Sequence, residues 1–569
     1  MEVCIFKIMN IYDINKVIKI LKENNKLRFA SKGDKIVEIN NKVIDNSLEY
    51  LTTFEVPEEW KDLEYKDNQK LTFNESINLL KGDTLPVSSF IKNKEGIFEG
   101  TTTKEEKRNI AEEVPCWISE NCIECNQCAF SCPHGVIRPF LLDKKDSKVE
   151  SIPSLLPKDK EFTIGINYEE CTGCGVCTLA CPGKLGKKAL EMVPNKDKEN
   201  NFEYLLKNNV NDKYQSNLLT VKNVSFKEPK FEYSGACAGC GETPYITNLT
   251  RVFNDNLMIA NATGCSSIYS GSVPSMPYSI PWASSLFEDN TEYGYGILQG
   301  INIKRDKIKK YMKEYPRNKL FKKWIENMDN YDICKEVKEN IDYKKHPYLN
   351  DMKDYILPKQ LWVLGGDGFA YDIGYGGLDH VLSKKDNINI LVLDTEVYSN
   401  TGGQSSKSSN IGSVASFTSN GKDNYKKDLA RIAMCYPHVY VASVNIGYNK
   451  EQYLKAIKEA SLHNGPSLII AYSPCIEHGI KTGMQHSQSN GYLATKCGYF
   501  LTFRYNPDTK KFSLDSKEPE FDKYEDYLMT ENRFASLVRK DKERARLLLE
   551  EQKQWAIDRY NYYKKISEE

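Results

Sequence analysis

The sequence predicts several domains: a larger α/β domain, with a parallel sheet covered by helices on both faces, preceded by a smaller α+β domain built around cysteines. Two observations support this prediction. Short apolar runs alternate with helical lengths after about residue 229, and a cysteine array is duplicated before it. The length of 569 residues also exceeds what one hydrophobic core usually organises.

The composition excludes some classes of function. The 78 Lys and Arg residues balance 78 Asp and Glu residues, so the chain lacks the basic field that drives nucleic-acid binding. No apolar run approaches the roughly 18–20 residues of a membrane span, and the opening residues show no signal-peptide cleavage pattern. We therefore expect a cytoplasmic protein with no nucleic-acid or membrane partner.

The first 110 residues carry no chemical motif. A helical stretch around residues 13–23 is followed by a strand-like KIVEI segment (residues 35–39) and a loop. We interpret residues 1–60 as the remnant of a preceding domain. The charged residues 61–110, punctuated by Gly and Pro, are interpreted as a linker.

Residues 111–228 contain two copies of the spacing C-x₂-C-x₂-C-x₃-C-P, which begin about 49 residues apart. In this pattern the first three cysteines bind one [4Fe–4S] cluster and the fourth reaches the other cluster. The spacing predicts a ferredoxin-like 2[4Fe–4S] domain. The predicted ligands are Cys122, Cys125, Cys128 and Cys181 for cluster 1, and Cys171, Cys174, Cys177 and Cys132 for cluster 2.

A pair of four-cysteine zinc sites is the alternative to the two clusters. Zinc motifs usually pair two C-x-x-C segments across a longer gap, which disfavours zinc here. Most of the 17 cysteines lie in tight arrays, unlike the dispersed cysteines of a disulfide-linked secreted domain. Five others are expected to be small buried apolar residues: Cys4, Cys116, Cys334, Cys435 and Cys497.

The region 229–569 has the pattern of a parallel sheet. The apolar runs are NLMIANATG, QLWVLGGDG, NINILVLDT, HVYVASV and PSLIIAYSP. Runs of this length, separated by helical lengths, are typical of strands buried on both faces. Residues 301–358 form a Lys-rich insertion that we expect to be helical; its basic face is either solvated or a docking surface for an acidic electron carrier.

Four more cysteines lie in loops beside these runs: Cys237, Cys240, Cys265 and Cys475. Loops at one end of a parallel sheet converge at the same edge. The residues alone leave two possibilities open, a third cluster or four separate buried cysteines.

A Gly366-Asp367-Gly368 turn follows one predicted strand, and an oxygen-rich loop, residues 394–400, follows another. The two loops are about 28 residues apart and can together hold one magnesium ion and the diphosphate that it neutralises. This arrangement predicts a thiamine diphosphate site, with an ordinary turn as the alternative. Thr395 stands where the motif usually has Asn, and its hydroxyl can still ligate magnesium.

The order of these segments resembles the C-terminal half of pyruvate:ferredoxin (flavodoxin) oxidoreductase. The resemblance is in NCIECNQCAFSCPHGVIRP, SGACAGCGETPY, NATGCSSIY, WASSLFEDNTEYGYG, GGDGFAYDIGYGGLDHVL and DTEVYSNTGGQSSKSS. It implies that residues 1–60 end a coenzyme A-associated domain. It also implies that residues 229–569 are a thiamine diphosphate domain with a proximal [4Fe–4S] cluster.

The resemblance further implies roles for individual residues. The proximal cluster would be bound by Cys237, Cys240, Cys265 and Cys475, and Mg²⁺ by Asp367, the Thr395 hydroxyl and the Val397 carbonyl. Asn400 would lie near the reacting centre as the catalytic residue. The expected cofactor contacts are Glu242, Cys265, Gly366, Asp367, Gly368, Phe369, Thr395, Glu396, Val397, Tyr398, Ser399 and Asn400.

The implied activity is oxidative decarboxylation of pyruvate to acetyl-CoA and CO₂, with electrons passing through three [4Fe–4S] clusters to ferredoxin or flavodoxin. Thiamine diphosphate and Mg²⁺ are the other cofactors, coenzyme A is the co-substrate, and a homodimer is expected. The half that holds the aminopyrimidine is expected to be missing or to be a separate subunit, so the chain alone is not expected to decarboxylate. Alternatives are an electron-transfer-only ferredoxin-type subunit, a non-catalytic interaction fragment and an oxidoreductase for another 2-oxoacid.

Overall fold

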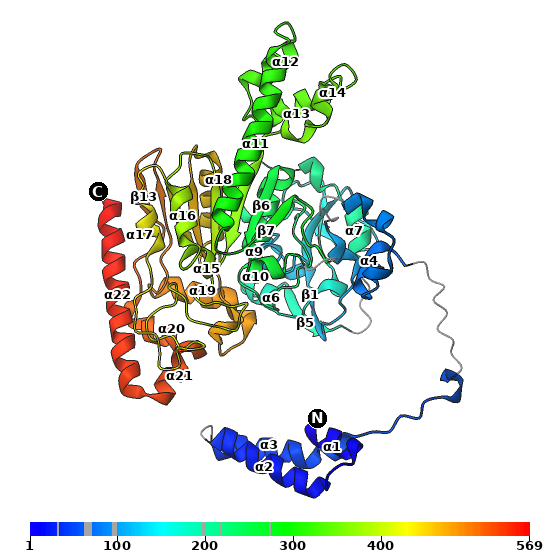
Figure 1. The fold of residues 1–569 in the computed structure, drawn as a ribbon, viewed down its shortest axis with the longest axis vertical. Coiled ribbons are helices and arrows are strands. Elements are labelled where there is room, and N and C mark those ends of the chain that lie inside the picture. Colours follow the sequence, from blue (N-terminus) through cyan, green and yellow to red (C-terminus); the bar gives the residue numbers. More distant parts are fainter. Residues whose placement is uncertain are drawn as a thin grey trace. The chain divides into compact units, whose positions relative to one another are not determined.

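The computed structural model divides the chain into two compact units, Met1–Ser76 and Ile77–Glu569 (Figure 1). The described residues are 1–30, 33–61, 71–93, 100–195, 201–214, 216, 218–271 and 275–568. Among them, no helix combines the length and the hydropathy that a membrane span requires.

The N-terminal unit is helical. It contains α1 (Glu2–Met9), α2 (Ile14–Phe29) and α3 (Asp34–Asn46), then the 3₁₀ turns η2 (Ser47–Tyr50) and η3 (Glu58–Trp60) and the start of α4 (Phe73–Asn78). The Asn25 side chain donates to Asn41 Oδ1 at 2.8 Å, which ties α2 to α3. The strand expected at KIVEI is wrong because these residues begin α3: Ile36, Ile39 and Val43 recur at helical spacing.

After α4, the described parts of the predicted linker contain three short 3₁₀ turns: η4 (Gly82–Thr84), η5 (Val87–Asn93) and η6 (Thr102–Glu105). Residues 62–70 and 94–99 lie outside the described residues. The last turn packs onto the following domains, since Thr103 is buried and donates to the Glu232 carbonyl at 3.2 Å.

The next residues form an α+β domain with internal pseudo-symmetry. Strand β1 (Glu113–Trp117) pairs antiparallel with β5 (Leu190–Pro194), and β2 (Ile137–Leu142), β4 (Glu161–Ile166) and β3 (Ile152–Pro153) form a second antiparallel sheet. Each cysteine array contains one short helix, α5 (Gln127–Ser131) or α6 (Val176–Ala180), and the two helices pack together. This confirms the α+β prediction. The domain ends with α7 (Phe202–Asn208), η9 (Asn211–Tyr214) and α8 (Val221–Ser225).

The large sheet has the strand order β13-β12-β10-β11-β9-β8-β6-β7. The five predicted apolar runs form parallel strands: β6 (Leu257–Ala262), β8 (Gln360–Gly365), β9 (Asn389–Asp394), β10 (Tyr440–Val444) and β11 (Ser467–Tyr472). Three strands were not predicted: β7 (Trp282–Ser285) at one edge, and an antiparallel hairpin of β12 (Phe503–Asn506) and β13 (Lys511–Leu514) at the other. They are short and only partly buried, so they lack a continuous apolar run.

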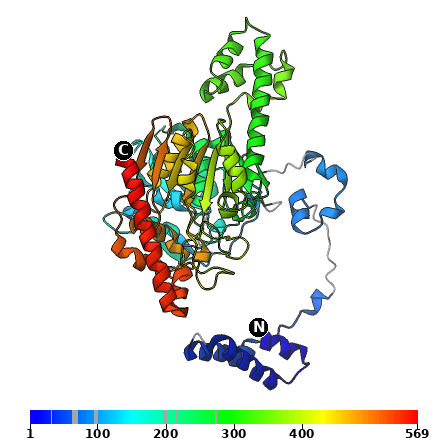
Figure 2. The ribbon, with the colours of Figure 1, turned by 60° about the vertical axis from the view of Figure 1, so that its left-hand side comes forward.

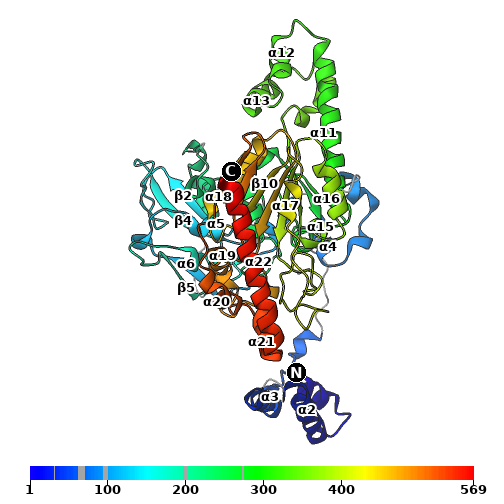
Figure 3. The same ribbon diagram turned by 90° about the vertical axis from the view of Figure 1, so that its left-hand side faces the viewer.

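Helices cover both faces of this sheet, as predicted (Figure 3). Alternate residues of β8 point to opposite sides: Val363 packs in one core and Trp362 in the other. The first core includes α16 (Tyr375–Leu382), α17 (Leu429–Ala433) and α22 (Lys542–Glu568), and the second includes α9 (Thr243–Phe253) and α18 (Lys450–Leu462). Phe130 of α5 belongs to the second core, so the ferredoxin-like domain packs on that face.

The insertion is helical, as expected. Helix α11 (Asn290–Lys313) starts against β6 and β8 and continues past the sheet to α12 (Lys319–Glu326), α13 (Tyr331–Asn340), α14 (Pro347–Asn350) and η11 (Lys353–Tyr355) (Figure 2). These elements share a separate small core around Trp324. The remaining elements are η7 (Ser119–Asn121), η8 (Tyr168–Glu170), η10 (Asn254–Asn256), α10 (Cys265–Ile268), α15 (Asp367–Ala370), η12 (Ile476–His478), η13 (Met484–His486), α19 (Ser487–Lys496), η14 (Phe521–Lys523), α20 (Tyr524–Leu528) and α21 (Asn532–Lys540).

Candidate functional site

A cavity of about 370 Å³ opens where β8 and β9 end, at the carboxyl edge of the sheet. This is the usual position of a ligand site in a parallel α/β sheet, and its size suits a cofactor. Every predicted cofactor contact lines it except Glu396: Glu242, Cys265, Gly366, Asp367, Gly368, Phe369, Thr395, Val397, Tyr398, Ser399 and Asn400. Sequence reasoning missed further lining residues: Thr263, Gly264, Ser266, Phe287, Ile373 and Thr401.

Asp367 is the first residue of α15 and is almost fully buried. Its Oδ2 atom accepts a hydrogen bond from Ser406 Oγ at 2.6 Å, whereas the buried Oδ1 atom has no partner. Burial, with a further contribution from Asp394, raises the pKa of Asp367 well above its usual value. A buried carboxylate oxygen that accepts no hydrogen bond is available to ligate a cation.

The Thr395 loop brings further oxygen atoms together. Thr395 Oγ1 donates to the Val397 carbonyl at 2.9 Å, and Ser399 Oγ donates to Thr395 Oγ1 at 3.0 Å. The predicted ligands of Mg²⁺ are thus an unpaired carboxylate oxygen, a hydroxyl and a carbonyl. Such an oxygen-only set matches the preference of a hard cation.

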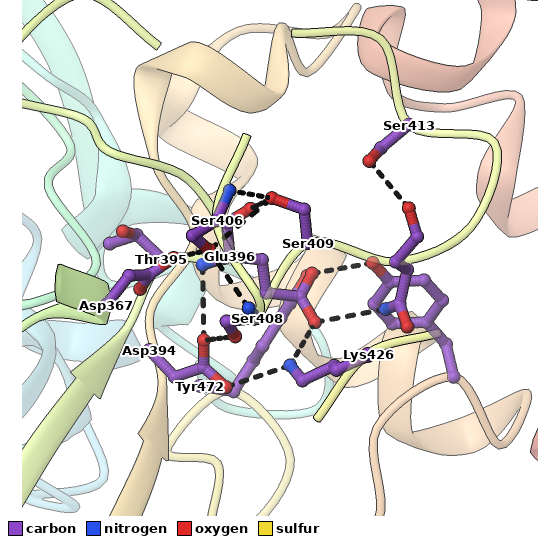
Figure 4. Close-up of polar contacts among 12 residues, drawn as sticks. Asp367, Asp394, Thr395, Glu396, Ser406, Ser408, Ser409, Ser413, Lys426 and Tyr472 are labelled. Atoms are coloured by element: carbon purple, nitrogen blue, oxygen red, sulfur yellow. Dashed lines mark hydrogen bonds and ion pairs between the residues drawn. The ribbon is translucent and has the colours of Figure 1, made fainter. Parts of the chain in front are cut away.

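The Glu396 side chain is buried in a hydrogen-bond network (Figure 4) and does not line the cavity. Its carboxylate accepts from Lys426 Nζ and from Tyr499 Oη, both at 2.6 Å, and lies 2.9 Å from Arg533 Nη2. Its backbone is left-handed, with φ +58°, which a non-glycine residue adopts only when its surroundings hold it there. The buried contacts of the Glu396 carboxylate therefore hold the backbone conformation of the Thr395 loop.

The same network holds both cofactor loops. Lys426 also donates to Asp394 Oδ2 at 2.9 Å, and Ser408 Oγ donates to Asp394 Oδ1. Because Ser406 binds Asp367, the segment 406–409 connects the two loops. Sequence reasoning assigned no role to these serines or to Lys426, although SSKSS was part of the resembling segments.

The four cysteines of the third set line a second cavity, of about 140 Å³. Cys237 and Cys240 precede α9, Cys265 begins α10 after β6, and Cys475 follows β11. Gly239 between the first pair has φ +80°, and an added Cβ would lie 2.6 Å from the Met484 carbonyl oxygen, so this turn requires glycine. The loops converge at one edge, as predicted.

The two cavities adjoin. They share four lining residues: Glu242, Cys265, Thr395 and Asn400. Cys475 Sγ donates to Ser399 Oγ of the Thr395 loop at 3.2 Å. Burial raises the pKa of the shared Glu242 to about 7, and its Oε2 atom has no hydrogen-bond partner.

The ferredoxin-type cysteines are grouped across the two arrays, as the spacing predicts. Cys132 of the first array lines one small cavity with Cys171, Cys174 and Cys177 of the second. Cys181 interacts electrostatically with Cys122, Cys125 and Cys128. Burial raises the pKa of the first three thiols of each array, that of Cys171 to about 12, so these thiols require a cationic partner to ionise.

The five remaining cysteines only partly follow expectation. Cys334 and Cys497 are buried, and Cys4 and Cys116 are half-buried. Cys435 is exposed, so the prediction that it is buried is wrong: it lies two positions after Ala433, the last core residue of α17, and therefore off the buried face. In the described part of the chain, no three His, Cys, Asp or Glu side chains form a ready site for one metal ion.

Comparison with known families confirms the two domain types. Residues 121–185 match the 4Fe-4S dicluster domain, and residues 354–471 match the C-terminal TPP-binding domain of thiamine pyrophosphate enzymes. The first match contains both cysteine arrays, and the second contains both cofactor loops. Residues 73–111, which belong to the predicted linker except for residue 111, match a domain of unknown function.

Curated relatives match the whole chain. The pyruvate:ferredoxin oxidoreductase of Moorella thermoacetica is 42% identical, with 100% of this chain and 52% of the relative covered. The pyruvate-flavodoxin oxidoreductase of Enterobacter agglomerans is 39% identical with the same coverage, and that of Klebsiella pneumoniae is 38% identical, again covering 100% and 52%. The chain thus spans about half the length of these relatives. Along its whole length the chain is homologous to the C-terminal part of the pyruvate:ferredoxin and pyruvate-flavodoxin oxidoreductases.

Proposed function

We propose that this chain is the cluster-binding and diphosphate-binding part of an enzyme that oxidatively decarboxylates pyruvate to acetyl-CoA and CO₂. Electrons pass through three [4Fe–4S] clusters to ferredoxin or flavodoxin. The adjoining cavities support this proposal most directly, because they share Cys265, Thr395 and Asn400. A cofactor in the larger cavity is then next to a cluster in the smaller one, which an electron-transfer-only subunit does not need.

The residues fit the implied cofactor. Thiamine diphosphate supplies an electron sink that allows a 2-oxoacid to lose carbon dioxide. In this proposal Asp367 Oδ1, Thr395 Oγ1 and the Val397 carbonyl hold the Mg²⁺ that neutralises its diphosphate. Asn400 and Glu242 line the side of the cavity next to the four cysteines.

Cluster 2 is the proposed link between the proximal cluster and cluster 1. The backbone of Gly239, between Cys237 and Cys240, interacts with the Cys174 thiol of the cluster 2 set. His134, which lines the cluster 2 cavity, lies 3.2 Å from the Ser234 carbonyl, three residues before Cys237. Electrons therefore leave the cofactor region through cluster 2, and cluster 1 passes them on.

We further propose that a separate N-terminal half completes the active site, and that the assembled enzyme is a homodimer using coenzyme A. The curated relatives are about twice as long as this chain. The N-terminal unit also exposes many large apolar side chains for its size: Ile20, Leu27, Ile36, Ile39, Val43, Tyr50, Phe54 and Trp60. Exposed apolar surface of this kind is typical of a missing contact.

Two measurements test the proposal. Calorimetry should detect binding of thiamine diphosphate with Mg²⁺ to the anaerobically prepared chain. Pyruvate-dependent dye reduction should appear only after the N-terminal half of a full-length relative is added. Rapid turnover by the chain alone would disprove the need for that half, and cluster binding without cofactor binding would favour an electron-transfer-only subunit.

A single thiol change should remove one cluster. We expect Cys475→Ser to lower iron and acid-labile sulfide by about a third, which is one of three clusters, because Cys475 lines the second cavity, where the proximal cluster is proposed to bind. Cys435→Ser is the matched control, since Cys435 is exposed and lines none of the cysteine cavities. Equal iron content in both variants would remove Cys475 from the ligand set.

A further inference from the structure

Three arginines lie in or against the ferredoxin-like domain, and they differ in how their charge is balanced. Arg108 Nε lies 3.0 Å from Glu170, and Arg138 forms an ion pair with Glu232. Arg251, on α9, is fully buried, yet within the described ranges no carboxylate lies at ion-pair distance from it. An uncompensated buried cation is unfavourable, because the ion loses its hydration without gaining a counter-ion.

The hydrogen bonds of Arg251 are also incomplete. Its Nη1 atom donates to the Ala129 carbonyl at 3.1 Å and to Asn248 Oδ1 at 3.0 Å. Its Nε and Nη2 atoms are buried without a partner. By contrast, Arg305 in the helical insertion is buried without an ion pair but leaves no buried nitrogen unpartnered, because backbone carbonyls accept from it.

The position of Arg251 indicates where its missing partners lie. Ala129 follows Cys128, a predicted ligand of cluster 1, and helix α5 ends immediately before Cys132, a predicted ligand of cluster 2. Burial lowers the pKa of Arg251 to about 9, while Cys132 and Cys128 act in the opposite direction. The guanidinium is therefore positively charged at neutral pH, and it contacts helix α5, which carries Cys128 of one cluster and ends at Cys132 of the other.

We propose that Arg251 is the counter-ion shared by the two ferredoxin-type clusters, and that its two unpartnered nitrogen atoms, Nε and Nη2, donate hydrogen bonds to the sulfur atoms of the clusters. This inference rests on the proposed function, because it requires the cysteine arrays to hold [4Fe–4S] clusters. Such a cluster with its four thiolates is an anion, and each electron that it accepts adds one negative charge. A fixed cation and N–H···S hydrogen bonds stabilise the reduced state, so Arg251 raises both reduction potentials.

In this proposal, a residue of the thiamine diphosphate domain sets the potentials of the two clusters in the ferredoxin-like domain. Helix α9 begins just after Cys240 of the proximal set and carries Arg251 on its last turns. Asn248, one turn earlier, donates to the Phe130 carbonyl at 2.9 Å and so holds α9 against α5. If Arg251 only holds α9 against α5, removing its charge should leave the reduction potentials of the clusters unchanged.

Redox titrations followed by electron paramagnetic resonance on the full chain separate the two roles. Replacing Arg251 by Gln should lower the reduction equilibrium constants of both ferredoxin-type clusters at least tenfold, which is about 59 mV for one electron. The proximal cluster should be unaffected. Arg251→Lys keeps the charge and should recover most of the loss, and Arg305→Gln is the matched control with no change in any potential.

Unchanged potentials in Arg251→Gln, or equal shifts of all three clusters, would overturn the inference. If Arg251→Gln loses its two ferredoxin-type clusters, retention of both in Arg251→Lys and Arg305→Gln supports the need for the charge. Loss of both in Arg251→Lys as well shows that the guanidinium is structural. A wild-type chain without iron and sulfide refutes the proposed function itself.

Discussion

Replacing Asp367 by Asn is expected to abolish tight binding of thiamine diphosphate with Mg²⁺ while leaving the chain folded. The Oδ1 atom of Asp367 is buried, has no partner and lines the cofactor cavity, so its charge is available only to a bound cation. Losing one partner of a buried charge pair costs about 2–5 kcal/mol. The dissociation constant measured by calorimetry should therefore rise roughly 30-fold or more.

The same substitution should not destabilise the cofactor-free chain. Asp394 lies close enough to raise the pKa of Asp367, and the neutral amide removes this repulsion. We expect the thermal midpoint without cofactor to be unchanged or higher, and the stabilisation by added cofactor to be lost. Asp379→Asn on α16 is the control, because Asp379 binds Tyr436 Oη at 3.1 Å and does not line the cavity. Full affinity in Asp367→Asn would exclude this residue as the metal ligand.

Some parts of the fold could be predicted because the chemistry requires them locally. A strand buried on both faces must be apolar throughout, and β8, β9, β10 and β11 were visible as such runs. The cysteine spacing is equally local, since three thiolates must reach one cluster. The strand prediction for KIVEI was wrong because it considered too short a stretch. Its five residues fit a strand, and only the recurrence of Ile36, Ile39 and Val43 over a longer stretch indicates a helix.

The side chains that hold the cofactor loops in place could not be predicted from the sequence. Glu396 looked like one more cofactor contact because it lies in the middle of the loop, yet its carboxylate is bound to Lys426 and Arg533. These partners are 30 and 137 residues away in sequence, and nothing local identifies them. Only the packing of α21 and of the segment before α17 against the loop brings the charges together.

Replacing Lys426 by Met is expected to lower the free energy of unfolding by about 3–5 kcal/mol, because breaking a buried ion pair leaves uncompensated charge. Lys426 is almost fully buried and holds both Asp394 and Glu396. Arg533 still pairs with Glu396 in the variant, but Asp394 retains only hydroxyl donors and a backbone N–H. Chemical denaturation of the variant and of Lys455→Met, an exposed lysine on α18, measures the difference.

The network also predicts a second effect of Lys426→Met, on binding. The left-handed backbone of Glu396 is held by the contacts of its carboxylate, so weakening them lets the loop relax. Thr395 and Val397 flank Glu396, and any change in its backbone moves two of the three proposed Mg²⁺ ligands. Cofactor affinity should therefore fall in Lys426→Met even at temperatures where the variant is folded. A folded variant with wild-type affinity would show that the loop keeps its shape without the buried charges, and that the network serves stability alone.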